Sequence, residues 1–136
     1  MAALDTNILV RWLVQDDAAQ TAAVAALFAA QATGSMRWFV PVTVLLELEW
    51  VLRSRYRFDK TAVIHALDAL LSTAELDLQH EAAIEQALWH YRPAGAPDFA
   101  DCLHAALASH LGHGPLITLD QRAAKLQGAQ LLPVLP

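Results

Sequence analysis

Two spacings of apolar residues alternate along the chain of 136 residues. Short apolar runs bounded by polar or turn residues are typical of buried strands, and they occupy residues 2–4, 36–40, 116–119 and 131–134. A further segment, residues 74–78, alternates between apolar and polar positions as an exposed strand would. The pattern therefore predicts a set of short strands spread over the whole chain.

Between these strands, apolar residues recur every three or four positions, which is the spacing of a helix with one buried face. The first helix is capped by Thr6 or Asn7 and ends at Val14. The second helix is predicted at residues 16–33 and is broken by residues 33–35. Later helices are predicted at residues 43–55, 59–71, 81–92 and 98–111, followed by a short helix that ends at residue 126. Because strands and helices alternate, we expect an α/β fold with a central, mainly parallel β-sheet flanked by helices on both faces.

Two of the predicted helices carry specific expectations. The side chains expected to face the core are Val44, Leu48, Val51 and Leu52 in one helix and Ile84, Leu88 and Trp89 in the other. Glu47 lies at the edge of the first of these faces and has no basic partner on its own helix. Glu49 has Arg53 four residues further on, so we expect an ordinary pair of surface charges there.

The composition limits the classes of protein to which the chain can belong. Its length suits one domain, residues 1–136. Its apolar runs fall short of the roughly 20 residues that cross a bilayer, and no signal peptide is evident, so we expect a cytoplasmic protein without membrane segments. The single Cys102 fits core packing. The net charge of −5 argues against broad attraction to nucleic acid, unless a divalent cation neutralises acids gathered at one site.

Acidic residues recur where the predicted strands end and the helices begin. Asp5 and Asp120 follow two of the strands, Glu47 lies in the helix 43–55, and Asp98 and Asp101 begin the helix 98–111. In an open α/β sheet the carboxyl ends of the strands form the ligand crevice, so we expect these side chains to gather there. Taken singly, each aspartate could instead cap a helix or favour its first turn, and the glutamate could simply be partly exposed.

Gathered carboxylates are the ligands that hard divalent cations such as Mg²⁺ or Mn²⁺ prefer, and the sequence has no Cys/His pattern with zinc spacing. Without a cation these acids would repel one another and raise one another's pKa values. A bound cation can orient a water molecule and stabilise the charge that develops on a phosphodiester. Hydrolysis of a phosphodiester bond is the reaction that fits best.

The order and spacing of these motifs resemble PIN-domain ribonucleases, and most of all the VapC toxins of bacterial toxin–antitoxin pairs. The segments that carry the resemblance are residues 4–9 (LDTNIL), the helix with Glu47, residues 98–106 (DFADCLHAA) and residues 118–120 (TLD). The resemblance covers essentially the whole chain and implies one PIN domain with Mg²⁺- or Mn²⁺-dependent endoribonuclease activity on RNA. It further implies the toxin component of a type II module, a homodimer, and a small VapB-type antitoxin whose tail enters the active-site groove of a larger complex.

The resemblance also implies roles for individual residues. The catalytic and metal-binding acids are Asp5, Glu47, Asp101 and Asp120. Asp98 is an additional or substitute ligand, and we favour Asp101 because Asp98 has the stronger capping alternative. The supporting polar groups are Thr6, Asn7 and Thr118.

Residues 53–60 (RSRYRFDK) form the basic cluster of the sequence, with aromatic side chains between the charges. This mixture suits RNA, because bases stack on rings while cations meet phosphates. It can equally be the solvated end of a helix or an antitoxin contact. The candidate RNA- or partner-binding residues are Arg53, Arg55, Arg57, Lys60 and His104. The tryptophans are mainly core candidates, and Trp50 is the one best suited to a dimer or partner face.

Two other functions fit part of the pattern. A housekeeping RNA-processing nuclease would carry the same acids, and growth arrest on expression would distinguish a toxin from it. A phosphoryl-receiving or metal-binding regulatory module without nuclease activity would also gather acids at strand ends. Receiver modules carry a lysine after the last strand, whereas Lys125 precedes that strand here.

Overall fold

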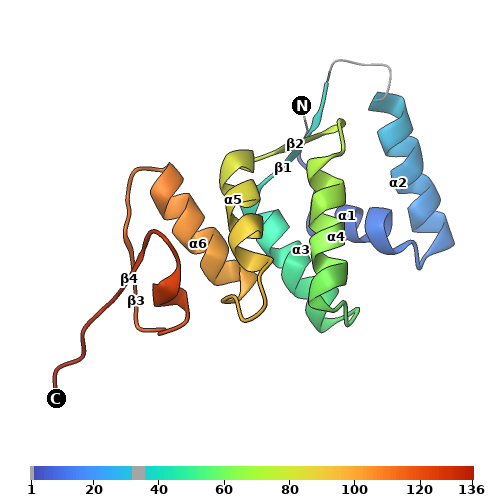
Figure 1. The fold of residues 1–136 in the computed structure, drawn as a ribbon. Helices are drawn as coiled ribbons and strands as arrows, with labels where there is room; N and C mark the ends of the chain where they lie inside the picture. Colours follow the sequence, from blue (N-terminus) through green and yellow to red (C-terminus); the bar gives the residue numbers. More distant parts are fainter. Residues whose placement is uncertain (1, 32–35) are drawn as a thin grey trace. The chain divides into compact units, whose positions relative to one another are not determined.

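The structure is a computed structural model of the chain, and it describes residues 2–31 and 36–136. Over these residues it contains six α-helices, one 3₁₀ helix and four strands, and the strands pair in parallel, which confirms the α/β class. The chain divides into two compact units, one ending at Gln79 and the other extending from His80 to Pro136 (Figure 1). In the described part of the chain, no helix is long and apolar enough to cross a bilayer.

The first unit is built on a small parallel sheet. Strand β1 (Trp38–Val40) pairs with β2 (Leu76–Leu78), and the amino-terminal run adds one parallel bridge, between Ala3 and Phe39. The predicted strand 2–4 is thus reduced to a single bridge, but Asp5 still follows it directly. The helices of this unit are α1 (Thr6–Val14), α2 (Ala18–Gln31), α3 (Val42–Ser54) and α4 (Lys60–Leu71).

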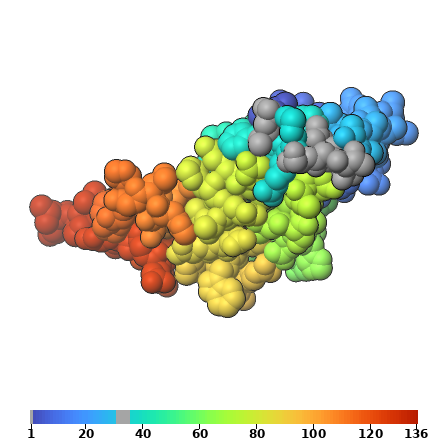
Figure 2. All heavy atoms as spheres, turned by 90° about the horizontal axis from the view of Figure 1, so that it is seen from above, coloured from blue at the N-terminus to red at the C-terminus, as the bar shows by residue number. Residues whose placement is uncertain are grey.

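The second unit has its own parallel pair of strands. Its elements are α5 (Glu81–Tyr91), α6 (Phe99–His110), β3 (Leu116–Thr118), the 3₁₀ helix η1 (Ala123–Lys125) and β4 (Ala129–Leu131). The last strand was predicted at 131–134 and lies earlier, because Pro133 has no N–H to donate to a ladder. Beyond β4 the red carboxyl-terminal residues lie at the surface in Figure 2, where Val134 and Leu135 are 79% and 87% exposed.

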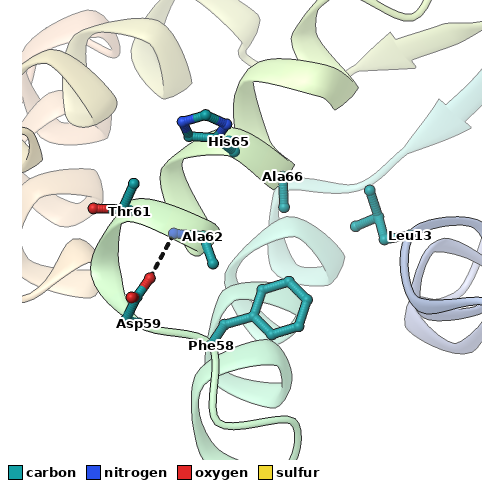
Figure 3. A pocket seen from close by; sticks show the side chains of 7 residues that line it. All are labelled: Leu13, Phe58, Asp59, Thr61, Ala62, His65 and Ala66. Carbon is teal, nitrogen blue, oxygen red and sulfur yellow. Dashed lines mark hydrogen bonds between the residues drawn. The ribbon is translucent and has the colours of Figure 1, made fainter.

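Carboxylate caps set where three helices of the first unit begin. Asp5 caps α1 by accepting a hydrogen bond from the Thr6 N–H, so the prediction that Thr6 or Asn7 is the cap is wrong. Asp17 precedes α2 and accepts from the Gln20 N–H. Asp59 caps α4 by accepting from the Ala62 N–H over 2.8 Å (Figure 3). The predicted break at 33–35 lies outside the described residues.

Helix α3 buries one face in the core of the first unit. Its side chains without solvent exposure are those of Leu45, Leu48 and Leu52. Each such burial stabilises the fold by about 1.5–3 kcal/mol. The predicted Val44 and Val51 are only half-buried, because the buried face is turned toward Leu45. Glu49 is 2% exposed and pairs with Arg53 over 2.9 Å, so the partner was predicted correctly but the surface location was wrong.

Helices α5 and α6 form the core of the second unit. The buried side chains of α5 are Ala83, Ile84, Ala87, Leu88 and Tyr91. The ring of Tyr91 meets Phe99 of α6 edge to face, with ring centroids 5.7 Å apart. Trp89 was predicted to face inward and is 72% exposed. It follows Leu88 by one residue, a turn of about 100°, which carries its side chain off the buried stripe.

Candidate functional site

The structure assigns the five candidate acids to its two units. Asp5 and Glu47 belong to the first unit, and Asp98, Asp101 and Asp120 belong to the second. Each group has its own geometry and its own electrostatics.

Thr6 connects the two acids of the first unit. Asp5 is exposed at the start of α1, and its Oδ1 accepts the Thr6 N–H over 2.7 Å. The Thr6 side chain is buried, and its hydroxyl donates to Glu47 Oε1 over 2.5 Å. Glu47 is itself exposed, as the alternative interpretation expected, and an exposed carboxylate needs no buried counter-charge but can still bind a cation. The hydrogen bond fixes the direction of an otherwise solvated carboxylate.

A cleft of about 210 Å³ opens beside this hydrogen bond, between α1 and α3. The residues of α1 that line it are Thr6, Asn7, Val10 and Arg11. The residues of α3 and the turn after it that line it are Glu47, Trp50, Val51, Arg55 and Tyr56. The predicted supporting groups Thr6 and Asn7 therefore share a cleft with Glu47.

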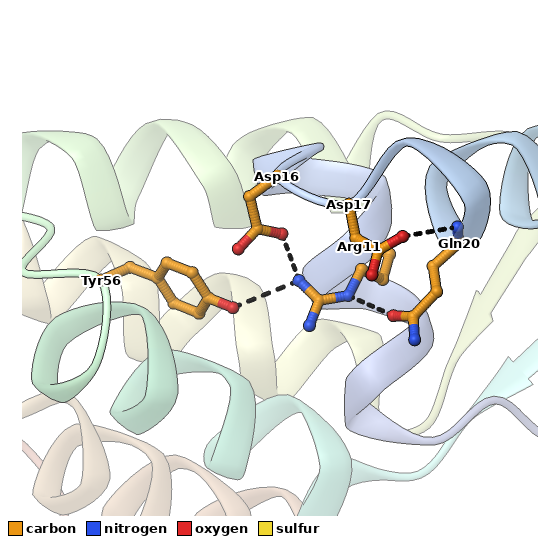
Figure 4. A network of polar contacts seen from close by, with 5 residues as sticks. All are labelled: Arg11, Asp16, Asp17, Gln20 and Tyr56. Atoms are coloured by element: carbon orange, nitrogen blue, oxygen red, sulfur yellow. Dashed lines mark hydrogen bonds and ion pairs between the residues drawn. The ribbon is translucent and has the colours of Figure 1, made fainter.

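Arg11 forms part of the cleft wall and is held by three partners. Its Nε donates to Gln20 Oε1 over 2.6 Å, and its Nη1 pairs with Asp16 and donates to the Tyr56 hydroxyl (Figure 4). The Tyr56 hydrogen bond is the first cause that raises the pKa of Arg11 above its ordinary value, and Asp16 adds to it. Sequence reasoning missed Arg11 because it lies outside the basic cluster. The available signal was an arginine one turn after Asn7, with Asp16 as a counter-charge.

A second pocket of the first unit, of about 510 Å³, lies beside the start of α4 (Figure 3). Its lining includes Leu13, Phe58 and His65, and the acid among its lining residues, Asp59, is engaged in capping α4. None of the candidate site residues lines this pocket. Of these two pockets, the smaller cleft beside Glu47 is the one lined by candidate site residues.

The acids of the second unit influence one another electrostatically. Asp98 stands at the N-cap position of α6 but its side chain makes no capping hydrogen bond, so the capping alternative is wrong for its carboxylate. Asp101 lies in the first turn of the same helix. Burial, followed by the negative charges of Asp120 and Asp98, raises the pKa of Asp101 above its ordinary value. The predicted rise in pKa is therefore found for Asp101, whereas the pKa of Asp120 is lowered, contrary to the prediction.

Asp120 is held by backbone groups of the turn after β3. Its Oδ1 accepts the N–H of Arg122 over 2.7 Å and that of Ala123 over 3.0 Å, and these bonds lower the pKa of Asp120. Thr118 supports the same turn, because its hydroxyl accepts the Asp120 N–H over 3.0 Å. Arg122 was not predicted. Its guanidinium donates to the carbonyl of Ala96 and so ties this turn to the loop before α6.

The predicted basic residues have different surroundings. Arg53 pairs with the buried Glu49, whereas Arg55 is exposed and lines the cleft. Arg57 is exposed and Lys60 is the first residue of α4. His104 is exposed on α6, one turn after Asp101, and its charge acts to lower the pKa of that carboxyl.

The PIN domain family matches residues 2–129, a range that contains all five candidate acids. The chain belongs to the PIN domain family. It is also 22% identical over 126 residues to the VapC ribonuclease of Aquifex aeolicus (strain VF5), in a comparison that covers 93% of this chain and 92% of that protein. The family resemblance inferred from the motifs is thereby confirmed.

The donor atoms of this PIN domain suit a hard divalent cation. The candidate ligands are carboxylates, and the one thiol, that of Cys102, is buried with its Sγ 3.7 Å from the Pro97 carbonyl. A cation would also relieve the repulsion that acts on Asp101. Among residues 2–31 and 36–136, no three Asp, Glu, His or Cys side chains gather closely enough to hold a metal ion. We therefore treat a metal site with carboxylate ligands from both units as a proposal.

Proposed function

We propose that this PIN domain is a metal-dependent endoribonuclease that hydrolyses RNA phosphodiester bonds and is the toxin component of a type II toxin–antitoxin module. The observation that carries the proposal is the family match over residues 2–129, which includes every predicted acid of the site. The similarity to a protein named VapC ribonuclease supports the choice of RNA as substrate.

In this proposal Asp5, Glu47, Asp101 and Asp120 together hold Mg²⁺ or Mn²⁺, with Asp98 as an additional ligand. When bound, the cation would supply positive charge that stabilises the phosphodiester as negative charge develops on it. Thr6 orients the Glu47 carboxylate through its 2.5 Å hydrogen bond. Asn7, exposed in the cleft beside Glu47, can hydrogen-bond to the RNA.

The residues of the second unit have complementary roles. The backbone N–H groups that lower the pKa of Asp120 keep that carboxylate ionised, while Thr118 fixes the turn that presents it. Asp101 is strained in the absence of a cation, since burial and neighbouring charge raise its pKa. We therefore retain Asp101 as the direct ligand. Asp98 has no capping hydrogen bond that would compete for its carboxylate.

The partners follow from the same proposal. The protein would act in the cytoplasm as one domain per chain, form a homodimer, and be inhibited by a cognate VapB-type antitoxin within a larger complex. A housekeeping processing nuclease would share the residues and the chemistry, so the two functions differ only in their consequence for the cell.

The decisive experiment expresses the chain with and without the neighbouring reading frame and maps the RNA ends that appear. We expect growth arrest and new RNA ends only without the neighbour, and neither effect from Asp5→Asn or Asp101→Asn. New ends without growth arrest would favour the processing nuclease. If neither appears, and the purified protein leaves RNA intact with Mg²⁺ and Mn²⁺, the nuclease proposal is wrong.

A further inference from the structure

The cleft between α1 and α3 combines a carboxylate, a cation and an aromatic surface along one helix. Glu47, Val51 and Arg55 follow one another at intervals of four residues and line the same cleft, with Trp50 beside them. From position 47 to position 55 the helix rises by about 12 Å. The carboxylate of the proposed catalytic site and the guanidinium of Arg55 thus lie at two ends of one polar surface.

Trp50 is unusual for a tryptophan in the first unit. Its side chain is 52% exposed although it lines a cleft, whereas Leu45, Leu48 and Leu52 of the same helix have no exposure. A large aromatic ring that is left half in water costs free energy that a stacked partner would recover. Tyr56 lies in the same lining, with its hydroxyl engaged by Arg11 (Figure 4).

The two arginines of the cleft differ in their charge balance. Arg11 is paired with Asp16 and hydrogen-bonded to Gln20 and Tyr56, so its charge is already matched. Arg55 is exposed, and among the described residues its guanidinium has neither a hydrogen-bond nor an ion-pair partner. The cleft therefore presents one available cation, suited to one phosphate group.

We propose that this cleft binds one nucleotide of the RNA next to the scissile bond, with its base stacked on Trp50 and its phosphate on Arg55. The cleft volume of about 210 Å³ is below the roughly 300–1,000 Å³ of pockets that enclose larger ligands, which suits a single nucleotide of an extended strand. Stacking on an aromatic ring tolerates every base, so the site adds affinity without selecting a sequence. The inference rests on the proposed ribonuclease function, because it assumes an RNA substrate.

The test measures binding of a single-stranded RNA hexamer of random sequence in EDTA, where no divalent ion is available. Titration is followed by the NMR signals of the tryptophan indole N–H groups and by fluorescence anisotropy of labelled RNA. We expect the Trp50 signal to shift and the Trp89 signal to stay. Trp50→Ala should weaken binding about tenfold, whereas Trp50→Phe should retain most of it, because the phenyl ring still stacks.

The salt dependence of RNA binding distinguishes the contribution of the Arg55 charge from that of the Trp50 ring. Arg55→Gln should lower the slope of log affinity against log salt by about 0.7, the value for one phosphate of a single strand, and Arg55→Lys should restore it. Trp50→Ala should weaken binding without changing the slope. Trp89→Ala removes a tryptophan of the second unit that is more exposed than Trp50, 72% against 52%, and should leave both quantities unchanged.

The outcomes distinguish this inference from the function on which it rests. RNA binding with a shifted Trp50 signal but no cleavage in Mg²⁺ or Mn²⁺ would support the nucleotide site and contradict the nuclease. Cleavage and binding that are unchanged in Trp50→Ala and Arg55→Gln would overturn the site and leave the nuclease intact. Unchanged RNA binding in variants that no longer pair with the antitoxin would also overturn it, since the cleft would then be a protein contact.

Discussion

The buried hydroxyl of Thr6 donates a 2.5 Å hydrogen bond to Glu47 Oε1 and so joins the first turn of α1 to the middle of α3. These residues are 41 positions apart in the sequence. Their contact explains how an exposed glutamate can have a defined direction, because the partner that holds it is itself fixed in the core.

Replacing Thr6 by Val keeps the shape of the side chain and removes the hydroxyl. We expect a modest loss of stability, about 0.5–1.5 kcal/mol in urea unfolding, because the freed carboxylate oxygen can be hydrated. RNA cleavage should fall by roughly 10- to 100-fold, the cost of a misdirected catalytic group. Thr6→Ser is the matched control and should keep most of the activity. Equal losses in both variants would show that the packing of Thr6 matters rather than its hydroxyl.

The positions of the acids could be predicted because Asp5 and Asp120 stand where an apolar run ends and a helical pattern begins. What the residues alone could not show is the contact between Thr6 and Glu47, since it joins two distant segments. Arg11 was missed for the same reason: its network depends on Tyr56, 45 positions away. The local sequence pattern predicts which residue ends a helix or strand. Long-range contacts decide which other side chains hydrogen-bond to that residue, and the local pattern does not show them.

The helices were easier to predict than their buried faces. Leu88 and Trp89 are neighbours of similar hydrophobicity, and the spacing pattern included both on the inner face. Packing against α6 uses the stripe that contains Ile84, Leu88 and Tyr91, and it leaves no place for the indole one position further round. The strands were overestimated in length because each pairs over only three residues.

This difference between neighbours gives a direct test of the packing. Leu88→Ala should destabilise the protein by about 2–5 kcal/mol, because it opens a cavity at a side chain that is 1% exposed. Trp89→Ala should change the free energy of unfolding by no more than about 0.5 kcal/mol, as at other exposed positions. Both are measured by urea unfolding at one pH. A cost for Trp89→Ala comparable to that of Leu88→Ala would show that the indole is buried.

Asp101 should reduce stability at neutral pH in the absence of metal. Burial and the charges of Asp120 and Asp98 raise its pKa in the folded chain, so the folded state binds its proton more tightly than the unfolded state does. The proton's stabilising contribution is complete below the unfolded pKa of about 3.9 and is lost as pH rises through the higher folded pKa.

Asp101→Asn should therefore be more stable than the natural protein in EDTA at pH 7, and this advantage should shrink as pH falls toward 4. Thermal unfolding across this pH range measures both. An advantage of Asp101→Asn that is independent of pH would exclude charge repulsion as its cause.

Asp5 and Asp101 come from different units, and whether they serve one cation can be measured without reference to activity. Calorimetric titration with Mn²⁺ is carried out on the natural protein, Asp5→Asn, Asp101→Asn and the double variant. If both carboxylates are ligands of one ion, each single change should weaken binding by at least about tenfold, and the double variant should be little weaker than either, because the site is already lost. Independent sites would instead give additive losses in the free energy of binding or two binding events. Urea unfolding measures a linked quantity, since Mn²⁺ at about 100 times its Kd should add about 2.7 kcal/mol to the stability of the natural protein and little to that of any variant. Stabilisation by Mn²⁺ that survives the double change would show that the ion binds elsewhere and would contradict the assignment of these two acids.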